Sequence, residues 1–210
     1  MGEKGGESMT TQGLKQSIRQ RILSEREQLP AGLRTQYSAA IVQRIVQLPK
    51  YQAARVVLGH MNFGAEFESE LWVKQALADG KQLLLPKVNR VTNELDIYRV
   101  TDLQHDLAPG LWNIREPLPD RCTRVDEPDE VNFILLPGVA FGLDGARLGY
   151  GGGFYDKLLA RIEDESGRDS LPALVAGAYS MQLVEGIPQE ATDRTVQCVV
   201  TENETIDCGK

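Results

Sequence analysis

The sequence predicts an α/β fold: a single domain with an open, mostly parallel sheet and helices on both faces, the three-layer αβα arrangement. Three observations predict it. Short apolar runs rich in β-branched residues alternate with longer segments of helical periodicity. A glycine cluster joins the most apolar run to a helix, and a length of 210 residues suits one domain. Ligands of such sheets bind beyond the carboxyl ends of the strands, so the loops there should form the site.

Two helices are expected first. Residues 10–29 place apolar and basic side chains at helical spacing. The apolar positions, expected to face the core, are Leu14, Ile18 and Ile22, and the basic ones on the other faces are Lys15, Arg19, Arg21 and Arg26. Pro30 ends this helix and can open a second one over residues 31–48.

The remaining elements alternate along the chain. Strands are expected at residues 55–61, 82–88, 95–100, 132–141, 173–178 and 196–201, and further helices at 69–78 and 154–163. Residues 101–130 are polar and carry several prolines, which predicts a long loop, and such a loop in a compact domain is usually functional. We place the domain at residues 10–205, with an extension at 1–9 and a short tail at 206–210.

Composition argues against several classes of protein. A formal charge of -7 is unlike a general nucleic-acid binder, which would carry a basic face. No apolar run approaches the roughly 20 residues of a membrane span, and the N-terminal residues lack a secretory signal. The three cysteines form no C-x-x-C pair, and two histidines are too few for a multi-histidine metal site. We expect a cytoplasmic protein with reduced cysteines and small-molecule ligands.

The glycine cluster is the first candidate site. Residues 142–157 read GLDGARLGYGGGFYDK, and the clustered glycines are Gly149, Gly151, Gly152 and Gly153. Glycines at a helix N-terminus let backbone N–H groups approach a phosphate, but a merely tight turn is an equal alternative. Neither the P-loop pattern nor the dinucleotide pattern occurs, since Phe154 stands where the last dinucleotide glycine would be. At least one of residues 151–153 should need a positive φ.

A longer pattern around these glycines resembles a known family. Residues 137–159 (PGVAFGLDGARLGYGGGFYDKLL) resemble the hallmark of 5-formyltetrahydrofolate cyclo-ligases, also called methenyltetrahydrofolate synthetases. Further matching features are Lys15 with Arg19, the loop of Glu66, residues 112–117 (WNIREP), and Pro188 with Asp193. The sequence departs from the pattern at residues 142–144 (GLD), where members usually have an aspartate directly after the aromatic residue.

The resemblance implies an enzyme that uses ATP and Mg²⁺ to convert 5-formyltetrahydrofolate to 5,10-methenyltetrahydrofolate through a phosphorylated formyl intermediate. A non-catalytic folate- or nucleotide-binding module on the same fold is the alternative. A sugar-phosphate isomerase or acyl-CoA transferase would rest on fold analogy alone. The expected partners are the two small-molecule substrates, with neither nucleic acid nor membrane, and the chain is expected to be a monomer.

The resemblance also assigns residues. Those implied to bind ATP are Lys15, Arg19, Arg147, Gly149, Gly151, Gly152, Gly153 and Tyr155. Those implied on the folate side are Met61, Glu66, Trp112, Tyr150 and Phe154, and those implied to bind Mg²⁺ are Asp156 and Asp193.

Plainer alternatives stand beside most of these assignments. Lys15 and Arg19 could be a solvated basic face, and Arg147 a surface salt bridge. Met61 could fill the core, and Trp112 could anchor its loop. The two aspartates could be an ordinary helix N-terminal residue and an ordinary loop residue.

Overall fold

The computed structural model describes residues 10–126, 128, 130–165 and 171–209, and the extension expected at residues 1–9 lies outside this described part. Helices and short 3-10 turns are α1 (Thr11–Gln28), α2 (Ala31–Val46), α3 (Pro49–Ala53), α4 (Ser69–Ala78), η1 (Leu111–Asn113), α5 (Phe154–Glu165) and η2 (Ser180–Gln182). Strands are β1 (Val56–Leu58), β2 (Gln82–Asn89), β3 (Glu94–Val100), β4 (Leu107–Pro109), β5 (Arg115–Pro117), β6 (Thr123–Val125), β7 (Phe133–Leu135), β8 (Ala140–Phe141), β9 (Arg147–Leu148), β10 (Ala173–Gly177), β11 (Cys198–Val200) and β12 (Thr205–Asp207).

The main sheet has eight strands in the order β12-β11-β10-β7-β1-β2-β3-β6. The inner strands from β11 to β2 run parallel to one another. The remaining strands, β12, β3 and β6, are antiparallel to their neighbours. The predicted α/β class with a mostly parallel sheet is therefore confirmed.

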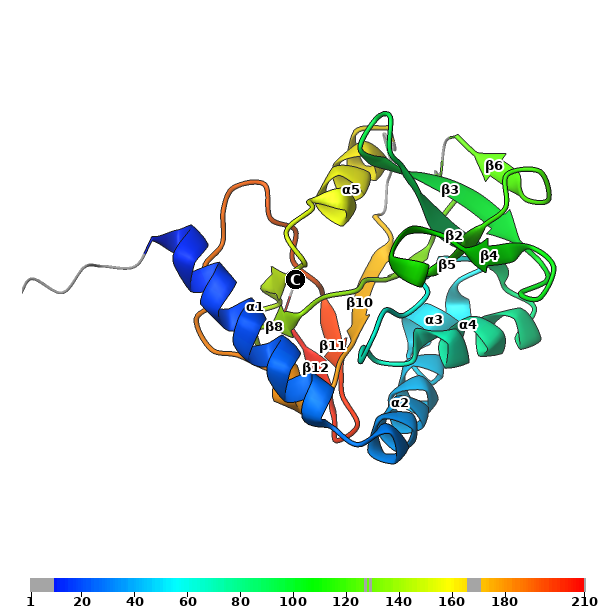
Figure 1. Ribbon diagram of the computed structural model, residues 1–210. Coiled ribbons are helices and arrows are strands. Elements are labelled where there is room, and N and C mark those ends of the chain that lie inside the picture. The colour runs from blue at the N-terminus through cyan, green and yellow to red at the C-terminus, as the bar shows by residue number, and fades with distance from the viewer. Residues whose placement is uncertain (1–9, 127, 129, 166–170, 210) are drawn as a thin grey trace, which may run out of the picture.

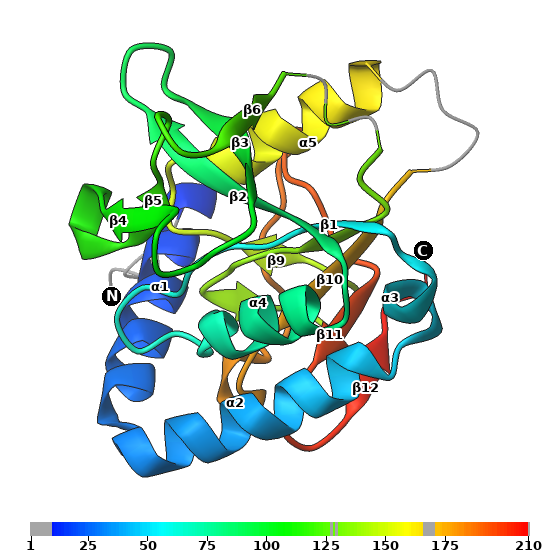
Figure 2. The same cartoon turned by 90° about the vertical axis from the view of Figure 1, so that its right-hand side faces the viewer.

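Helices cover both faces of this sheet (Figures 1 and 2). On one face α2 and α4 enclose a core that includes Ile41, Trp72 and Phe133, and on the other face α5 contributes Leu158 to a second core around Ile134. α1 lies beside the sandwich, where Ile22 packs with residues of β8 and β9 (Figure 1). None of the described helices is long and apolar enough to cross a membrane.

One predicted strand, residues 132–141, is divided in the structure. β7 ends at Leu135, and β8 then pairs antiparallel with β9 in a separate hairpin. Pro137 lacks the N–H that a central strand would donate, so it marks the break. A Cβ on Gly138 would lie 2.5 Å from the ring of Phe141, so the bend that follows requires glycine.

Several short elements were not predicted, and most of them are strands that long-range pairing creates. The segment expected to be a loop at residues 101–130 contains the β4–β5 hairpin and the edge strand β6. The second predicted helix ends two residues early, and the short helix α3 begins at Pro49. Ile206 and Asp207 pair with β11, so the sheet extends into the segment expected to be a tail.

The buried face of α1 differs from the expected one. Leu14 is 39% exposed, whereas Lys15, Ile22 and Arg26 are buried. The prediction that the basic side chains lie away from the buried face is wrong for Lys15 and Arg26. Helical spacing identified the helix, but it could not show that cations rather than leucine face the interior.

Candidate active site

The candidate site lies where the strand order reverses. β1 pairs with β2 on one side and with β7 on the other, and a crevice opens beyond the carboxyl ends at such a point. The two strand ends are joined by His60, whose Nδ1 lies 3.1 Å from the carbonyl oxygen of Leu135. Because that carbonyl can only accept, Nδ1 carries the hydrogen. Burial lowers the pKa of His60, so the ring is neutral at pH 7.

Glu66 follows β1 and is buried with both carboxylate oxygens hydrogen-bonded. Oε2 accepts from the backbone N–H of Phe63 at 2.7 Å, and Oε1 accepts from the Tyr150 hydroxyl at 2.5 Å. The Tyr179 hydroxyl donates to the backbone oxygen of Glu66 at 3.0 Å. The carboxylate is therefore fixed as an acceptor beside the glycine turn.

The glycine turn, residues 149–153, has the backbone conformation that the sequence predicts. Gly151 has a φ of 104° and Gly153 a φ of 66°, both unfavourable for residues with a Cβ. Gly152 is needed for a different reason, because a Cβ there would lie 2.8 Å from the ring of Phe154. α5 begins directly after the turn, so its free N–H groups open at this place.

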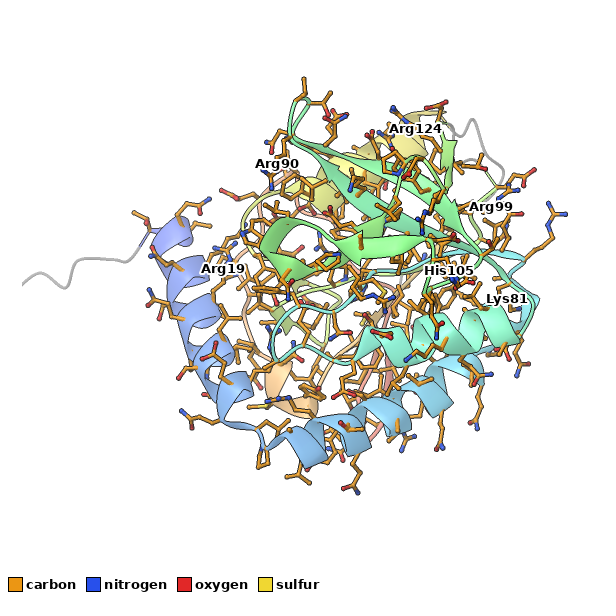
Figure 3. The ribbon with its side chains drawn as sticks, turned by 45° about the vertical axis from the view of Figure 1, so that its right-hand side comes forward. Arg19, Lys81, Arg90, Arg99, His105 and Arg124 are labelled. Atoms are coloured by element: carbon orange, nitrogen blue, oxygen red, sulfur yellow. The ribbon has the colours of Figure 1, made fainter. Side chains whose placement is uncertain are left out.

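Two cations on α1 reach this turn and the loop before β11. Lys15 is 3% exposed and binds Asp193 at 2.6 Å and Glu190 at 2.9 Å. Burial alone would lower the pKa of Lys15, but its bonds to the two carboxylates raise it. Arg19 Nε donates to the carbonyl oxygen of Gly149 at 2.7 Å, and Figure 3 shows its side chain extending from α1 toward the centre of the molecule. Burial removes the solvated-face alternative for Lys15.

Arg147 and Asp156 form an ion pair at the start of α5. Arg147 Nη2 lies 2.5 Å from Asp156 Oδ1, and Arg147 is 7% exposed, so the pair is not the surface salt bridge of the plainer alternative. The same Oδ1 accepts from the backbone N–H of Arg194 at 3.2 Å. On Asp193, burial acts to raise the pKa, but the hydrogen bond from Lys15 and the charge of Arg147 hold it below its ordinary value.

These aspartates are the candidate metal ligands, and each is already paired with a cation. Among the described residues no group of three or more His, Cys, Asp or Glu side chains is arranged to hold a metal ion. Mg²⁺ commonly takes only one or two protein carboxylates, with phosphate oxygens and water completing its shell. Asp156 and Asp193 fit that kind of site and do not form a closed protein cage.

Exposed aromatic rings stand next to Glu66. Phe63 lies 6.3 Å from the Tyr150 ring and 6.5 Å from the Trp112 ring, between ring centroids. Trp112 is 59% exposed and has a φ of 55°, a strained conformation that is common at functional sites. This aromatic cluster, Phe63, Trp112 and Tyr150, offers a surface for a flat ring beside a carboxylate.

The other predicted residues are distributed between core and site. Met61 is buried in the core of the α2–α4 face, which supports the alternative that it fills the core. Phe154 and Tyr155 pack partly against the core of the opposite face. Burial raises the pKa of Tyr155, the charge of Glu66 raises it further, and the charge of Arg147 lowers it, so Tyr155 lies within the fields of both groups.

Sequence reasoning missed Phe63, Glu190 and Arg26. Phe63 and Glu190 carry no motif and are recognised only by their contacts. Arg26 could have been found, because it lies seven residues after Arg19 and so shares its helix face. Its Nη2 donates to the Tyr150 hydroxyl at 2.7 Å.

Similarity to known proteins extends over most of the chain. The model of the 5-formyltetrahydrofolate cyclo-ligase family matches residues 11–202. The chain belongs to this family. A mouse 5-formyltetrahydrofolate cyclo-ligase is 27% identical over 199 residues, covering 93% of this chain and 97% of the relative. A probable cyclo-ligase of Caenorhabditis elegans is 28% identical over 170 residues, covering 80% of this chain and 82% of the relative.

Solved structures of the cyclo-ligase family share the fold. The 5,10-methenyltetrahydrofolate synthetase of Aquifex aeolicus superposes with a TM-score of 0.79 at 33% identity, covering 94% of each chain. The synthetase of Mycoplasma pneumoniae superposes with a TM-score of 0.68 at 19% identity, covering 90% of this chain and 98% of that one, and shows the fold alone.

The backbone of the glycine turn gives a first prediction. Gly153→Ala should lower the free energy of unfolding by about 1 kcal/mol because alanine disfavours positive φ, and it should also weaken ATP binding by distorting the N–H groups. Gly80→Ala is the matched control. Gly80 has a φ of 72° with equally open surroundings, and it lies after α4, before the amino end of β2. Both variants should lose similar stability in urea unfolding, but only Gly153→Ala should bind ATP more weakly in calorimetry. Equal ATP affinity in the two variants would contradict a phosphate role for the turn.

Proposed function

We propose that this member of the cyclo-ligase family converts 5-formyltetrahydrofolate to 5,10-methenyltetrahydrofolate, consuming ATP and releasing ADP and phosphate. One observation supports this most: a single turn carries both halves of the site. Gly149 contacts the cation Arg19, and Tyr150, the next residue, contacts the carboxylate Glu66. Two substrates bound on these two sides would meet at the turn.

The reaction explains why these residue types are present. A formamide oxygen is a weak nucleophile, and its attack on the γ-phosphoryl of ATP would give a phosphorylated formyl intermediate and ADP. Attack by the N10 amine on the activated carbon then closes the five-membered ring as phosphate leaves. Phosphoryl transfer requires positioning and charge neutralisation more than acid–base groups, so cations and backbone N–H donors can carry it.

The residues divide between the two substrates. Lys15, Arg19 and Arg147 would contact the phosphates, together with the N–H groups at the start of α5. Glu66 would accept hydrogen bonds from the folate ring, and the aromatic cluster would hold the face of that ring. Tyr155, within the fields of Glu66 and Arg147, would lie where the two substrates meet.

Mg²⁺ would bind at Asp156 and Asp193 together with the phosphates of ATP. The ion would neutralise charge on the transferring phosphoryl group. In the protein alone each carboxylate is held by a cation through one oxygen, Oδ1 of Asp156 and Oδ2 of Asp193, so the ion would bind the other oxygen or take the place of the cation.

Location and assembly are proposed on the same basis. The described cysteines, Cys122, Cys198 and Cys208, are free thiols, as a reducing cytoplasm would keep them. We propose a cytoplasmic monomer whose partners are the two small-molecule substrates, without nucleic acid or membrane.

A spectroscopic assay tests the function. Methenyltetrahydrofolate formation from 5-formyltetrahydrofolate should require ATP and Mg²⁺ and should stop when the metal is chelated. The alternative, a non-catalytic binding module, is not favoured because Lys15, Arg147 and Asp156 are all present, with Arg147 paired to Asp156 and Lys15 paired to Asp193. A protein that binds ATP and folate but forms no product would restore that alternative.

The folate-side role of Glu66 gives a second prediction. Glu66→Gln keeps the shape but removes the charge, and it should raise the KM for 5-formyltetrahydrofolate roughly tenfold or more, since hydrogen bonds to charged groups contribute about 1.5–3 kcal/mol. The KM for ATP should stay within about twofold. Glu68→Gln is the control, because Glu68 lies in the same loop but accepts a hydrogen bond from Thr35 on α2. Equal losses for both substrates would remove the assignment to the folate side.

The metal role of Asp156 gives a third prediction. Asp156→Asn should keep the folded circular dichroism spectrum at a lower melting temperature, because Arg147 loses its charged partner. It should also lower turnover by orders of magnitude at limiting Mg²⁺, because the amide is a poorer ligand. The measurement is turnover against Mg²⁺ concentration at saturating ATP. Normal activity at limiting Mg²⁺ would show that Asp156 is no ligand.

A further inference from the structure

We propose that Arg26 is a positioning residue: from α1 it orients the Tyr150 hydroxyl toward Glu66 and so sets the acceptor geometry of the folate-side carboxylate. The inference rests on the proposed function. It concerns a residue that lies outside the glycine turn and outside the set implied by family resemblance.

Arg26 is buried without the partners that a buried cation normally has. It is 3% exposed, and its Nε and Nη1 atoms have no hydrogen-bond partner among the described residues. No described carboxylate lies within ion-pair distance of it. It donates to the Tyr150 hydroxyl, and its guanidinium carbon lies 5.8 Å from the centroid of the Tyr150 ring. An apolar side chain would fill this position at lower cost, as Ile22 does one turn earlier. Stability of the fold therefore does not explain an arginine here.

The chemistry of the groups fixes the direction of the hydrogen bonds. Arginine can only donate, so the Tyr150 oxygen accepts from Arg26 Nη2 at 2.7 Å. The single hydrogen of the Tyr150 hydroxyl is then directed at Glu66 Oε1, 2.5 Å away. Since Phe63 N–H occupies Oε2, the carboxylate is held from both ends. Without Arg26 the hydroxyl could rotate or accept from water, and this hold on Oε1 would be lost.

α1 presents its functional side chains at spacings of four, three and four residues: Lys15, Arg19, Ile22 and Arg26. They share one helix face, and roughly 16 Å separates its ends at 1.5 Å per residue. Lys15 and Arg19 act at the phosphate end, whereas Arg26 acts at the folate end. A defect in the helix as a whole would affect both substrates, and a defect in Arg26 alone should affect folate. This separation makes the two roles distinguishable.

The experiment is a double-mutant cycle of Arg26→Met and Tyr150→Phe, with KM and kcat measured for each substrate and melting temperature recorded. Arg26→Met should raise the KM for 5-formyltetrahydrofolate about tenfold, leave the KM for ATP within about twofold, and leave the melting temperature unchanged or higher. Arg26→Lys, which keeps a charged donor, should recover part of the loss. In the Tyr150→Phe background, Arg26→Met should add less than twofold, because both residues act through one hydroxyl. Arg21→Met is the control on an exposed position of the same helix.

Several results would overturn the proposal. Parallel losses for ATP and folate, or a lowered melting temperature with an equally lowered kcat, would assign Arg26 a structural role. Full additivity with Tyr150→Phe would show that Arg26 does not act through that hydroxyl. If Arg26→Met failed to fold, Arg26 would have a structural role. The coupling between Arg26 and the Tyr150 hydroxyl could then still be measured with Arg26→Lys and Tyr150→Phe. If the unmodified protein formed no product, both the proposed function and this inference would be contradicted. If the wild type turned over normally and the Arg26 variants were unaffected, only the inference would be contradicted.

Discussion

The parallel pairing of β1 with β2 on one side and β7 on the other is the constraint on which the site depends. After β1 the chain continues to β2 on one side of β1, and it later returns to the opposite side at β7. The loops that follow β1 and β7 therefore diverge and leave space between them. The loop after β1 brings Glu66, and the segment after β7 brings the β8–β9 hairpin and the glycine turn. The bond from His60 to the Leu135 carbonyl fixes the two strand ends relative to each other. The position of each functional group therefore follows from topology before any side chain is considered.

α1 depends on this arrangement and adds a second layer to it. It packs against the β8–β9 hairpin through Ile22, so its placement is set by the same segment that carries the glycine turn. That contact is apolar. The charged side chains on the same face, Lys15 before Ile22 and Arg26 after it, contact Asp193 and the Tyr150 hydroxyl. Ile18 and Leu23 pack partly buried against the same cluster, so α1 has a narrow apolar contact flanked by the buried cations Lys15 and Arg26. In this position it also brings the positive charge of Arg19 to the glycine turn.

The parts of this structure that depend on local pattern could be predicted from sequence, and the parts that depend on distant partners could not. Helical spacing found α1, and the glycine cluster after an apolar run predicted a positive φ that occurs at Gly151 and Gly153. The Arg26–Tyr150 bond joins residues 124 positions apart, and the Tyr150–Glu66 bond joins residues 84 positions apart. The periodicity of apolar residues along the sequence does not indicate contacts between residues so far apart. The division of the strand at residues 132–141 was visible in Pro137, but an apolar run outweighed it in the prediction.

On the proposed function, the ion pairs of Lys15 and Arg147 limit how tightly a nucleotide can bind. Lys15 is held by Asp193 and Glu190, and Arg147 by Asp156, at distances of 2.5 to 2.9 Å. In the protein alone both cations are thus already bound to carboxylates, so a nucleotide gains only the difference between its own contacts with the cations and the contacts that it displaces. Removing one partner of such a pair would leave a buried charge uncompensated, which costs far more than the pair contributes. Under the function proposed above, an ATP–Mg²⁺ complex would bring a cation to the two aspartates as its phosphates reach Lys15 and Arg147, whereas ATP without the ion would place phosphate beside the carboxylates. If the nucleotide binds as proposed, electrostatic balance favours its entry as the magnesium complex.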